Sequence, residues 1–121
     1  MIAPTTTGDI AIFPGHEPLV TLAETGMLAV RRNKGDRDDK LEYYAITGGV
    51  IEVTPTSIRV LVDAADYADD ILETEAAEAL EAAKRLRDEA KDQVELDKAH
   101  QLVDRHAVRL RVAELQRRRR R

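Results

Sequence analysis

The sequence predicts an α+β fold, in which an N-terminal antiparallel β sandwich is followed by an antiparallel hairpin of two α-helices. All four prolines and all six glycines lie at or before Pro55, and 12 of the 17 valines and isoleucines lie at or before Val62. Ten of the 17 alanines follow Ala65. β-Branched residues suit strands, whereas alanine-rich, charged segments favour helix. We therefore expect a β-sandwich domain over residues 1–65 and a helical hairpin with a basic C-terminal tail over residues 66–121.

The first half contains short segments typical of strands, separated by turn residues. They span residues 10–13, 19–22, 27–31, 41–46, 50–53 and 58–62. Residues 33–40 are predicted to form a charged hairpin tip, and residues 54–57 a tight turn that places Pro55 where its fixed φ is favourable. In the last strand, Arg59 is typical of a solvent-facing position, whereas Leu61 is not. Strands at this spacing favour an antiparallel sandwich or barrel.

The second half contains two apolar stripes at helical spacing. Asp70 is expected to cap the first helix, with Glu73 at the reciprocal position of a capping box, and Asp92 and Glu95 repeat this pattern for the second helix. The first stripe comprises Leu72, Ala76, Ala79, Leu80, Ala83, Leu86 and Ala90, and the second comprises Leu96, Ala99, Val103, His106, Leu110 and Ala113. Because alanine buries little area, we expect this hairpin to be marginal alone and sensitive to what it docks against.

Charge is divided between the two predicted helices. Residues 66–95 contain 11 acids and 4 bases, whereas residues 96–121 contain 3 acids and 9 bases. Packed antiparallel, the two helices should attract each other. The five arginines at 117–121 remain available to an acidic partner, although a solvated terminus explains them equally well.

Several classes of function are excluded by the residues. The chain has no cysteine, which excludes a disulfide scaffold, a thiolate zinc site and a cysteine nucleophile. No phosphate-binding glycine loop, metalloprotease motif or serine-nucleophile motif is present, and the three histidines are too scattered for a metal site. No segment approaches the ~20 apolar residues that span a bilayer, and no signal-peptide pattern is expected. The residues alone indicate a non-enzymatic interaction module without a cofactor.

Four sequence blocks resemble one known family. Residues 8–19, GDIAIFPGHEPL, closely resemble the GELGIxPGHxPL signature of the ε subunit of bacterial F-type ATP synthases. Residues 45–53, AITGGVIEV, are similar to the family's (S/T)GG(I/V)(L/I)EV strand pair, and residues 26–28 to its PGM-plus-strand element. Residues 109–115, RLRVAEL, are similar to its late-helix LRVxEL. The resemblance spans nearly the whole chain in the family's order.

The resemblance implies a non-catalytic rotor subunit in ATP synthesis driven by an ion gradient. In this family the sandwich binds the γ subunit and lies on the membrane-embedded c-ring, which implies a peripheral position at the cytoplasmic face of the plasma membrane. Asp9, His16 and Glu17 match turn positions that would contact the c-ring. The resemblance implies neither a cofactor nor a nucleic-acid partner.

The resemblance also implies that the hairpin is mobile. Extended along γ, it would place Arg105, Arg109 and Arg111 against acidic surfaces of the α/β catalytic head and inhibit ATP hydrolysis. Some family members bind ATP through an Ile-Asp-x-x-Arg-Ala motif, but the matching residues 71–76 carry Leu72 and Glu75 at its Asp and Arg positions. We therefore expect no ATP binding. The segment before residues 1–4 that forms the family's first strand is also expected to be missing.

A second interpretation stays open at this stage. The chain could be a free-standing adaptor whose basic helical arm binds nucleic acid or another acidic partner. The two interpretations differ in what they require. A rotor subunit must co-purify with γ and a membrane ring, whereas the adaptor must show strongly salt-dependent binding to nucleic acid.

Overall fold

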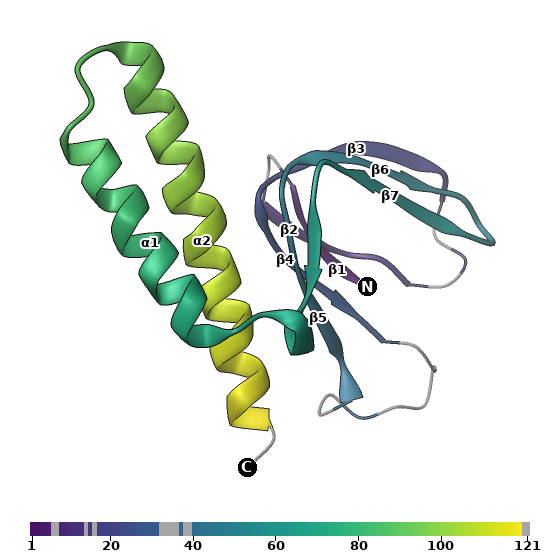
Figure 1. Cartoon of the computed structure of the whole chain (residues 1–121). Helices are drawn as coiled ribbons and strands as arrows, with labels where there is room; N and C mark the ends of the chain where they lie inside the picture. Colours follow the sequence, from purple (N-terminus) through teal and green to yellow (C-terminus); the bar gives the residue numbers. More distant parts are fainter. Residues whose placement is uncertain (6–7, 14, 16, 32–36, 38–39, 120–121) are drawn as a thin grey trace.

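A computed structural model describes residues 1–5, 8–13, 15, 17–31, 37 and 40–119 of the 121-residue chain. It places strands in the first half and two long helices in the second (Figure 1). The strands are β1 (Ile2–Thr5), β2 (Gly8–Ala11), β3 (Leu19–Ala23), β4 (Gly26–Val30), β5 (Glu42–Ile46), β6 (Gly49–Val53), β7 (Ile58–Val62) and β8 (Ala65–Tyr67). A 3-10 turn, η2 (Ala68–Asp70), leads to α1 (Glu73–Asp88) and α2 (Gln93–Arg119).

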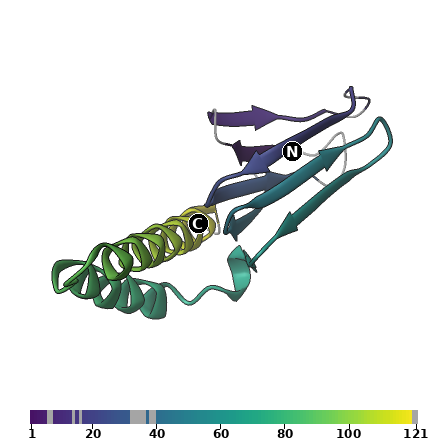
Figure 2. The same ribbon diagram turned by 90° about the horizontal axis from the view of Figure 1, so that it is seen from above.

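The strands form one curled antiparallel sheet whose two halves face each other, which confirms the expected sandwich (Figure 2). The strand order is β7-β6-β3-β1-β4-β5-β8, and β2 pairs with β1. β1 joins the halves because Thr5 lies opposite Ala23 of β3 while Ile2 lies opposite Ala29 of β4. A core of buried side chains fills the space between the halves, among them Ile12, Leu28, Ile46, Ile51 and Val53.

Two strands, β1 and β8, lie outside the six that the sequence predicted. Each is short: β8 pairs with the distant β5, whereas β1 forms a local hairpin with β2 and also touches β3 and β4 at one residue pair each. β8 also extends the sheet to Tyr67, across the expected domain boundary after residue 65. The expected hairpin tip at 33–40 falls mostly outside the described residues.

The turn between β6 and β7 forms where it was predicted. The Thr54 N–H donates to the Ser57 carbonyl at 2.8 Å, and the Ser57 N–H donates to Thr54 Oγ1 at 3.0 Å. β6 begins at Gly49, where a Cβ atom would collide with the Leu61 carbonyl oxygen of β7. Only glycine therefore fits at this close approach of the two strands.

The expectation that Leu61 avoids solvent is wrong. Leu61 lies on the outer face of β7 and is 48% exposed, whereas Val60 and Val62 line the interior. Strand alternation places Leu61 on the same face as Arg59, and no other element of the described chain covers this face. The apolar side chain of Leu61 suggested burial, but the alternation of side chains along the strand places it on the outer face of the sheet.

The predicted cap at Asp70 is also wrong. Asp70 lies in the 3-10 turn, Ile71 and Leu72 are extended, and α1 begins at Glu73 with no side-chain cap at Leu72. The extended conformation of Ile71 and Leu72 allows the Ile71 side chain to pack against the sheet before the helix starts, and this side chain is only 6% exposed. Burial of this side chain therefore overrides the local capping signal.

The second cap is largely as predicted. Asp92 Oδ1 accepts a hydrogen bond from the Glu95 N–H at 2.8 Å, which is the forward half of a capping box. Glu95 Oε2 accepts from the Lys91 N–H at 3.0 Å instead of from Asp92. Because α2 starts at Gln93, Asp92 is its N-cap.

The helices pack through small side chains, and α2 then packs on the sheet. Ala76 and Ala83 of α1 are buried, as are Ala99 and Ala113 of the predicted α2 stripe. Leu86 of the α1 stripe is 54% exposed and Leu72, which precedes the helix, is 59% exposed, so the first stripe is narrower than predicted. A second face of α2 contacts the sheet through Val108 and Val112, which cluster with Met27, Tyr43 and Ala45.

We predict that Asp92→Ala destabilises the hairpin by about 1 kcal/mol because the Glu95 N–H loses its acceptor. Asp70→Ala is the matched control, since Asp70 caps no helix, and its effect should stay within about 0.5 kcal/mol. Amide hydrogen exchange of α2 in the full chain measures both. Equal losses of protection in the two variants would contradict this cap assignment.

Candidate functional site

The candidate site has three parts: a turn region before β3, a basic face on α2, and an apolar strip on the outer face of the sheet. Asp9 lies within β2, opposite Pro4, and is exposed. Glu17 follows the turn and is also exposed, whereas His16 lies outside the described residues. Asp9 borders a crevice between the sheet and α2, so it lies apart from the residues that follow β2.

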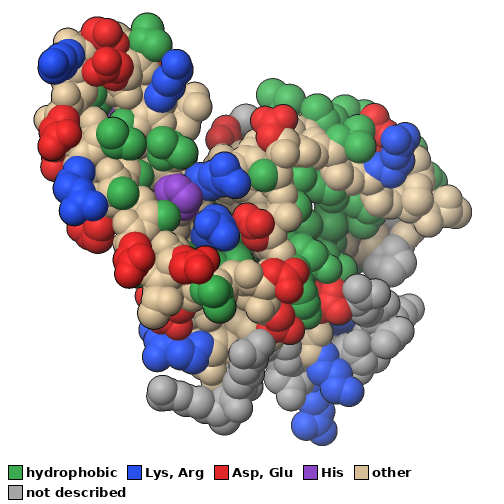
Figure 3. Space-filling model, viewed as in Figure 1, with side chains coloured by type: hydrophobic (Ala, Val, Ile, Leu, Met, Phe, Trp, Pro, Cys, Tyr) green, Lys and Arg blue, Asp and Glu red, His purple; other side chains and the backbone are tan. Residues whose placement is uncertain are grey.

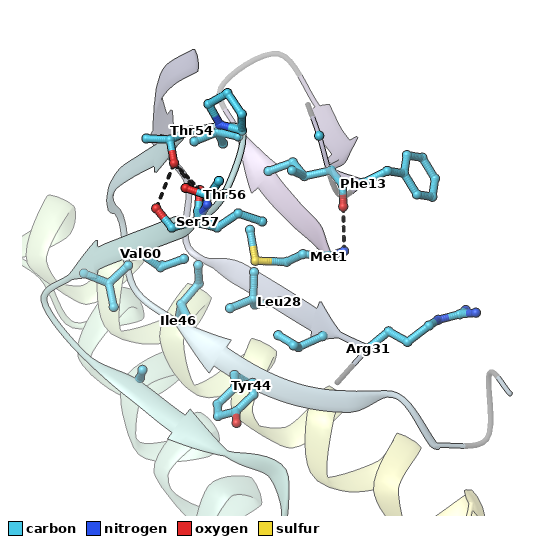
Figure 4. A pocket seen from close by; sticks show the side chains of 18 residues that line it. Met1, Phe13, Leu28, Arg31, Tyr44, Ile46, Thr54, Thr56, Ser57 and Val60 are labelled. Atoms are coloured by element: carbon cyan, nitrogen blue, oxygen red, sulfur yellow. Dashed lines mark hydrogen bonds between the residues drawn. The ribbon is translucent and has the colours of Figure 1, made fainter. Parts of the chain in front are cut away.

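An exposed aromatic side chain next to this turn was missed by the sequence analysis. Phe13, the single phenylalanine of the chain, is 71% exposed. In Figure 4 its ring points away from the interior cleft of the sandwich. The available signal was the alternation of side chains, since Phe13 follows the buried Ile12 and so points to the other side. It gives the acidic turn region an apolar contact.

The three arginines predicted to act together on α2 lie on two sides of the helix. Arg109 Nε lies 3.1 Å from Asp66 Oδ2 of β8, and both side chains are partly buried. Arg105, one turn earlier, borders a pocket with Asp63 and Lys98. Arg111 is exposed and borders the crevice that also contains Asp9. Two residues along a helix correspond to about 200° of rotation, which explains the separation.

Side-chain contacts join the C-terminal end of α2 to the start of α1 and to η2. Arg117 Nε lies 3.1 Å from Glu73 Oε2, and Gln116 Nε2 donates to Asp69 Oδ1 at 2.8 Å. The first arginine of the basic tail therefore has an acidic partner within the chain. This contact matches the attraction expected from the opposite charges of the two helices.

An apolar strip crosses the outer face of β3, β6 and β7. Val20 is 70% exposed, Leu22 is 59% exposed, and Leu61 is 48% exposed. The strand register aligns Leu22 with Val50 and Val50 with Leu61, so these side chains form a continuous row. The neighbouring row ends in an exposed ion pair between Arg59 and Glu52, 3.5 Å apart. Such a surface is typical of a protein–protein contact.

A cleft lined mainly by apolar side chains lies between the two halves of the sheet and has a volume of about 660 Å³ (Figure 4). Leu28, Tyr44, Ile46 and Val60 line it, and the nearby hydroxyl groups of Thr54 and Ser57 bond to each other at 2.8 Å. The described residues contain no group of three side chains able to hold a metal ion. In the same part of the chain, no helix is long and apolar enough to cross a membrane.

Comparison with known proteins identifies the family. The family model for the ATP synthase Delta/Epsilon chain β-sandwich domain matches residues 1–68. An ATP synthase epsilon chain from Herpetosiphon aurantiacus is 39% identical over 118 residues, covering 97% of this chain and 82% of the relative. The chain belongs to the ATP synthase epsilon chain family. This finding confirms the resemblance drawn from the sequence blocks.

A further epsilon chain is similar over most of its length, and one solved structure shares the fold. The ATP synthase epsilon chain of Neisseria meningitidis is 35% identical over 103 residues, which cover 85% of this chain and 71% of the relative. A chain in the cryo-EM structure of the Euglena gracilis mitochondrial ATP synthase shares the fold, with a TM-score of 0.76 and 24% identity. That match covers 93% of this chain and 68% of the other. The epsilon-chain likeness therefore includes the helices as well as the sheet.

We predict a measurable coupling between Arg109 and Asp66. A double-mutant cycle with Arg109→Met and Asp66→Asn should give about 1 kcal/mol, the upper end for ion pairs near a surface. The pair Arg59–Glu52 is the matched control because its side chains are 66% and 39% exposed, and its coupling should be close to zero. Urea unfolding of the full chain measures both cycles, and equal couplings would contradict the role of Arg109 in docking.

Proposed function

We propose that this chain is the rotor subunit of the central stalk of an F-type ATP synthase, linking the γ subunit to the c-ring. The observation that carries this proposal is the continuous apolar strip on the outer face of the sheet, in a chain of the epsilon family. The subunit is non-catalytic and works as a mechanical link. It is peripheral to the membrane, at the cytoplasmic face of the plasma membrane.

The apolar strip is assigned to the γ contact. Leu22, Val50 and Leu61 form a row across three paired strands, and such a row loses solvent-exposed apolar area when a partner covers it. The Arg59–Glu52 pair at its border supplies polar rim contacts. A permanent stalk contact requires this kind of surface, because rotation must be transmitted without slip.

The turn region is assigned to the c-ring. Glu17 provides an acidic group and Phe13 an exposed ring, both between β2 and β3, whereas Asp9 lies apart within β2 and is assigned to the same contact by its sequence match. His16 belongs to the same region by sequence. A carboxylate beside an aromatic ring suits contact with the polar, partly apolar loops that a membrane ring presents to water.

The helical hairpin, which the sequence placed over residues 66–121 and which α1 and α2 form after β8 and η2, is assigned to the inhibition of ATP hydrolysis. Its docking uses alanines between the helices and two valines on the sheet, so it is weak enough to reverse. Arg109 is engaged with Asp66 while docked and becomes available to acidic surfaces of the α/β catalytic head on release. Arg111 is exposed in the docked arrangement as well.

We predict that a chain ending at Asp69 supports assembly and ATP synthesis and raises ATP hydrolysis severalfold, because it lacks the inhibitory arm. Arg111→Gln should raise hydrolysis partly, since Arg111 is exposed and its loss leaves docking intact. Lys91→Gln, an exposed base at the other end of the hairpin, is the control and should change nothing. Hydrolysis by the assembled enzyme is the measurement; an unchanged rate in the truncated complex would remove the inhibitory role.

We predict that Leu22→Glu combined with Leu61→Glu reduces co-purification with γ by at least about tenfold. The two buried charges should weaken the binding free energy by more than about 1.4 kcal/mol. Both side chains are exposed, so the free subunit should keep its fold, which circular dichroism checks. Thr56→Glu, on the exposed β6–β7 turn, is the control. If the double variant still binds γ, the γ contact lies on another face of the subunit.

A further inference from the structure

The covalent connection between the sheet and the hairpin is a short extended linker. Ile71 and Leu72 have extended backbone conformations, with η2 ending at Asp70 on one side and α1 beginning at Glu73 on the other. Leu72 gives α1 no side-chain cap. Residues at the ends of elements, such as these two, absorb the changes of φ and ψ at a hinge. In Figure 1 the linker passes beside the C-terminal part of α2.

The C-terminal end of α2 contacts both sides of this linker. Gln116 Nε2 donates to Asp69 Oδ1 at 2.8 Å, on η2 before the linker. Arg117 Nε lies 3.1 Å from Glu73 Oε2, on α1 after the linker. Two adjacent side chains of one helix therefore bridge the two ends of the linker.

Apolar packing closes the linker between these two contacts. Ile71 is 6% exposed and shares one buried cluster with Ala68 of η2, Ala76 of α1 and Val112 of α2. Ala45 of β5 belongs to the same cluster. A bend at the linker that carries the hairpin away from the sheet must open this cluster and expose the side of α2 that faces the sheet.

A contact of the same chemistry elsewhere on the hairpin stays within one helix. Acidic and basic side chains are interspersed along the visible face of the hairpin (Figure 3). Gln93 Nε2 donates to Asp97 Oδ1 at 2.7 Å, and both residues belong to α2. The contact between Gln116 and Asp69 also joins an amide to a carboxylate, but it connects α2 to an element on the other side of the linker. Its position, and not its chemistry, sets it apart.

We propose that the linker at residues 71–72 is the hinge of the hairpin and that Gln116 and Arg117 splint this hinge in the docked arrangement. Because Arg117 holds the last turn of α2 to α1, Gln116 stays within reach of Asp69. The hairpin then leaves the sheet only after the contact between Gln116 and Asp69 breaks. The inference rests on the mobility assigned to the hairpin under the proposed function. It does not depend on inhibition of hydrolysis, because docking is a property of the chain alone.

The test measures how often the hairpin leaves the sheet, through the reaction of a buried thiol. The chain has no cysteine, so Val112→Cys introduces a single thiol at a position of α2 that is 0% exposed. Its rate of labelling by a thiol reagent, relative to the rate in the urea-unfolded chain, gives the fraction of time for which α2 is released. Ala83→Cys, at a position of α1 that is 3% exposed, is the companion thiol and reports separation of the two helices.

In the Val112→Cys chain, Gln116→Ala should raise the labelling rate about fivefold, because a hydrogen bond to a carboxylate is lost in the docked form only. Adding Arg117→Ala should bring the increase to about tenfold. Gln93→Ala removes the matching contact at the other end of α2 and should change the rate by less than about twofold. In the Ala83→Cys chain, Gln116→Ala should leave the rate unchanged, because the helices stay together.

An exchanged pair makes the test specific to the contact. Gln116→Glu places a second carboxylate opposite Asp69 and should raise the labelling rate at position 112 more than Gln116→Ala does. Asp69→Asn in the same chain again places a donor opposite a carboxylate, and should return the rate to within about twofold of the parent. A loss of packing alone would not be rescued in this way.

Three results would overturn the proposal: an unchanged rate with Gln116→Ala, an equal effect of Gln93→Ala, or no rescue of Gln116→Glu by Asp69→Asn. Equal acceleration of the two thiols would overturn it too, because the helices would then separate from each other. If Val112→Cys loses the native circular dichroism spectrum, Ala45→Cys supplies the thiol from the sheet side of the same cluster, with the same expected outcomes. Because no ATPase is assayed, failure here leaves the rotor function untouched.

Discussion

The contact between α2 and the sheet is the interaction on which the arrangement of this molecule depends. Val108 and Val112 meet Met27, Tyr43 and Ala45 along one side of the helix, and α1 reaches the rest of the molecule mainly through α2. The helix pair itself is joined by alanines, which pack closely but bury little apolar area. If the α2 contact opens, both helices leave together, so the hairpin moves as a unit.

Electrostatics determine how firmly this contact holds. The Asp66 carboxylate lies 3.1 Å from Arg109 Nε, whereas Arg105, one turn earlier, has a buried Nε without a hydrogen-bond partner. A partly buried set of like charges costs free energy that the few apolar side chains must offset. The apolar contact that offsets this cost is small, because it consists mainly of two valines of α2 against Met27, Tyr43 and Ala45.

Much of the fold is predictable from local patterns, and the exceptions share one cause. Strand alternation, glycine and proline positions and the heptad-like α2 stripe depend on neighbouring residues, and the elements they predicted are present. β8 and the late start of α1 at Glu73 depend on contacts with distant segments, such as the pairing of β8 with β5 and the burial of Ile71. No local signal carries that information, because the partner becomes a neighbour only after folding.

In the candidate site, too, the sequence predicts what local geometry determines and misses contacts between distant segments. That Arg109 and Arg111 lie on different sides of α2 follows from helical rotation and was available in the sequence. That Asp66 lies opposite Arg109 was not, because it requires the pairing of β8 with β5 and the docking of α2 above them. The acid that holds the basic face in the docked state is therefore supplied by the last strand of the sheet. The side chain that pairs with Arg109 is thus placed by the register of β8 on β5, and not by its position along the chain.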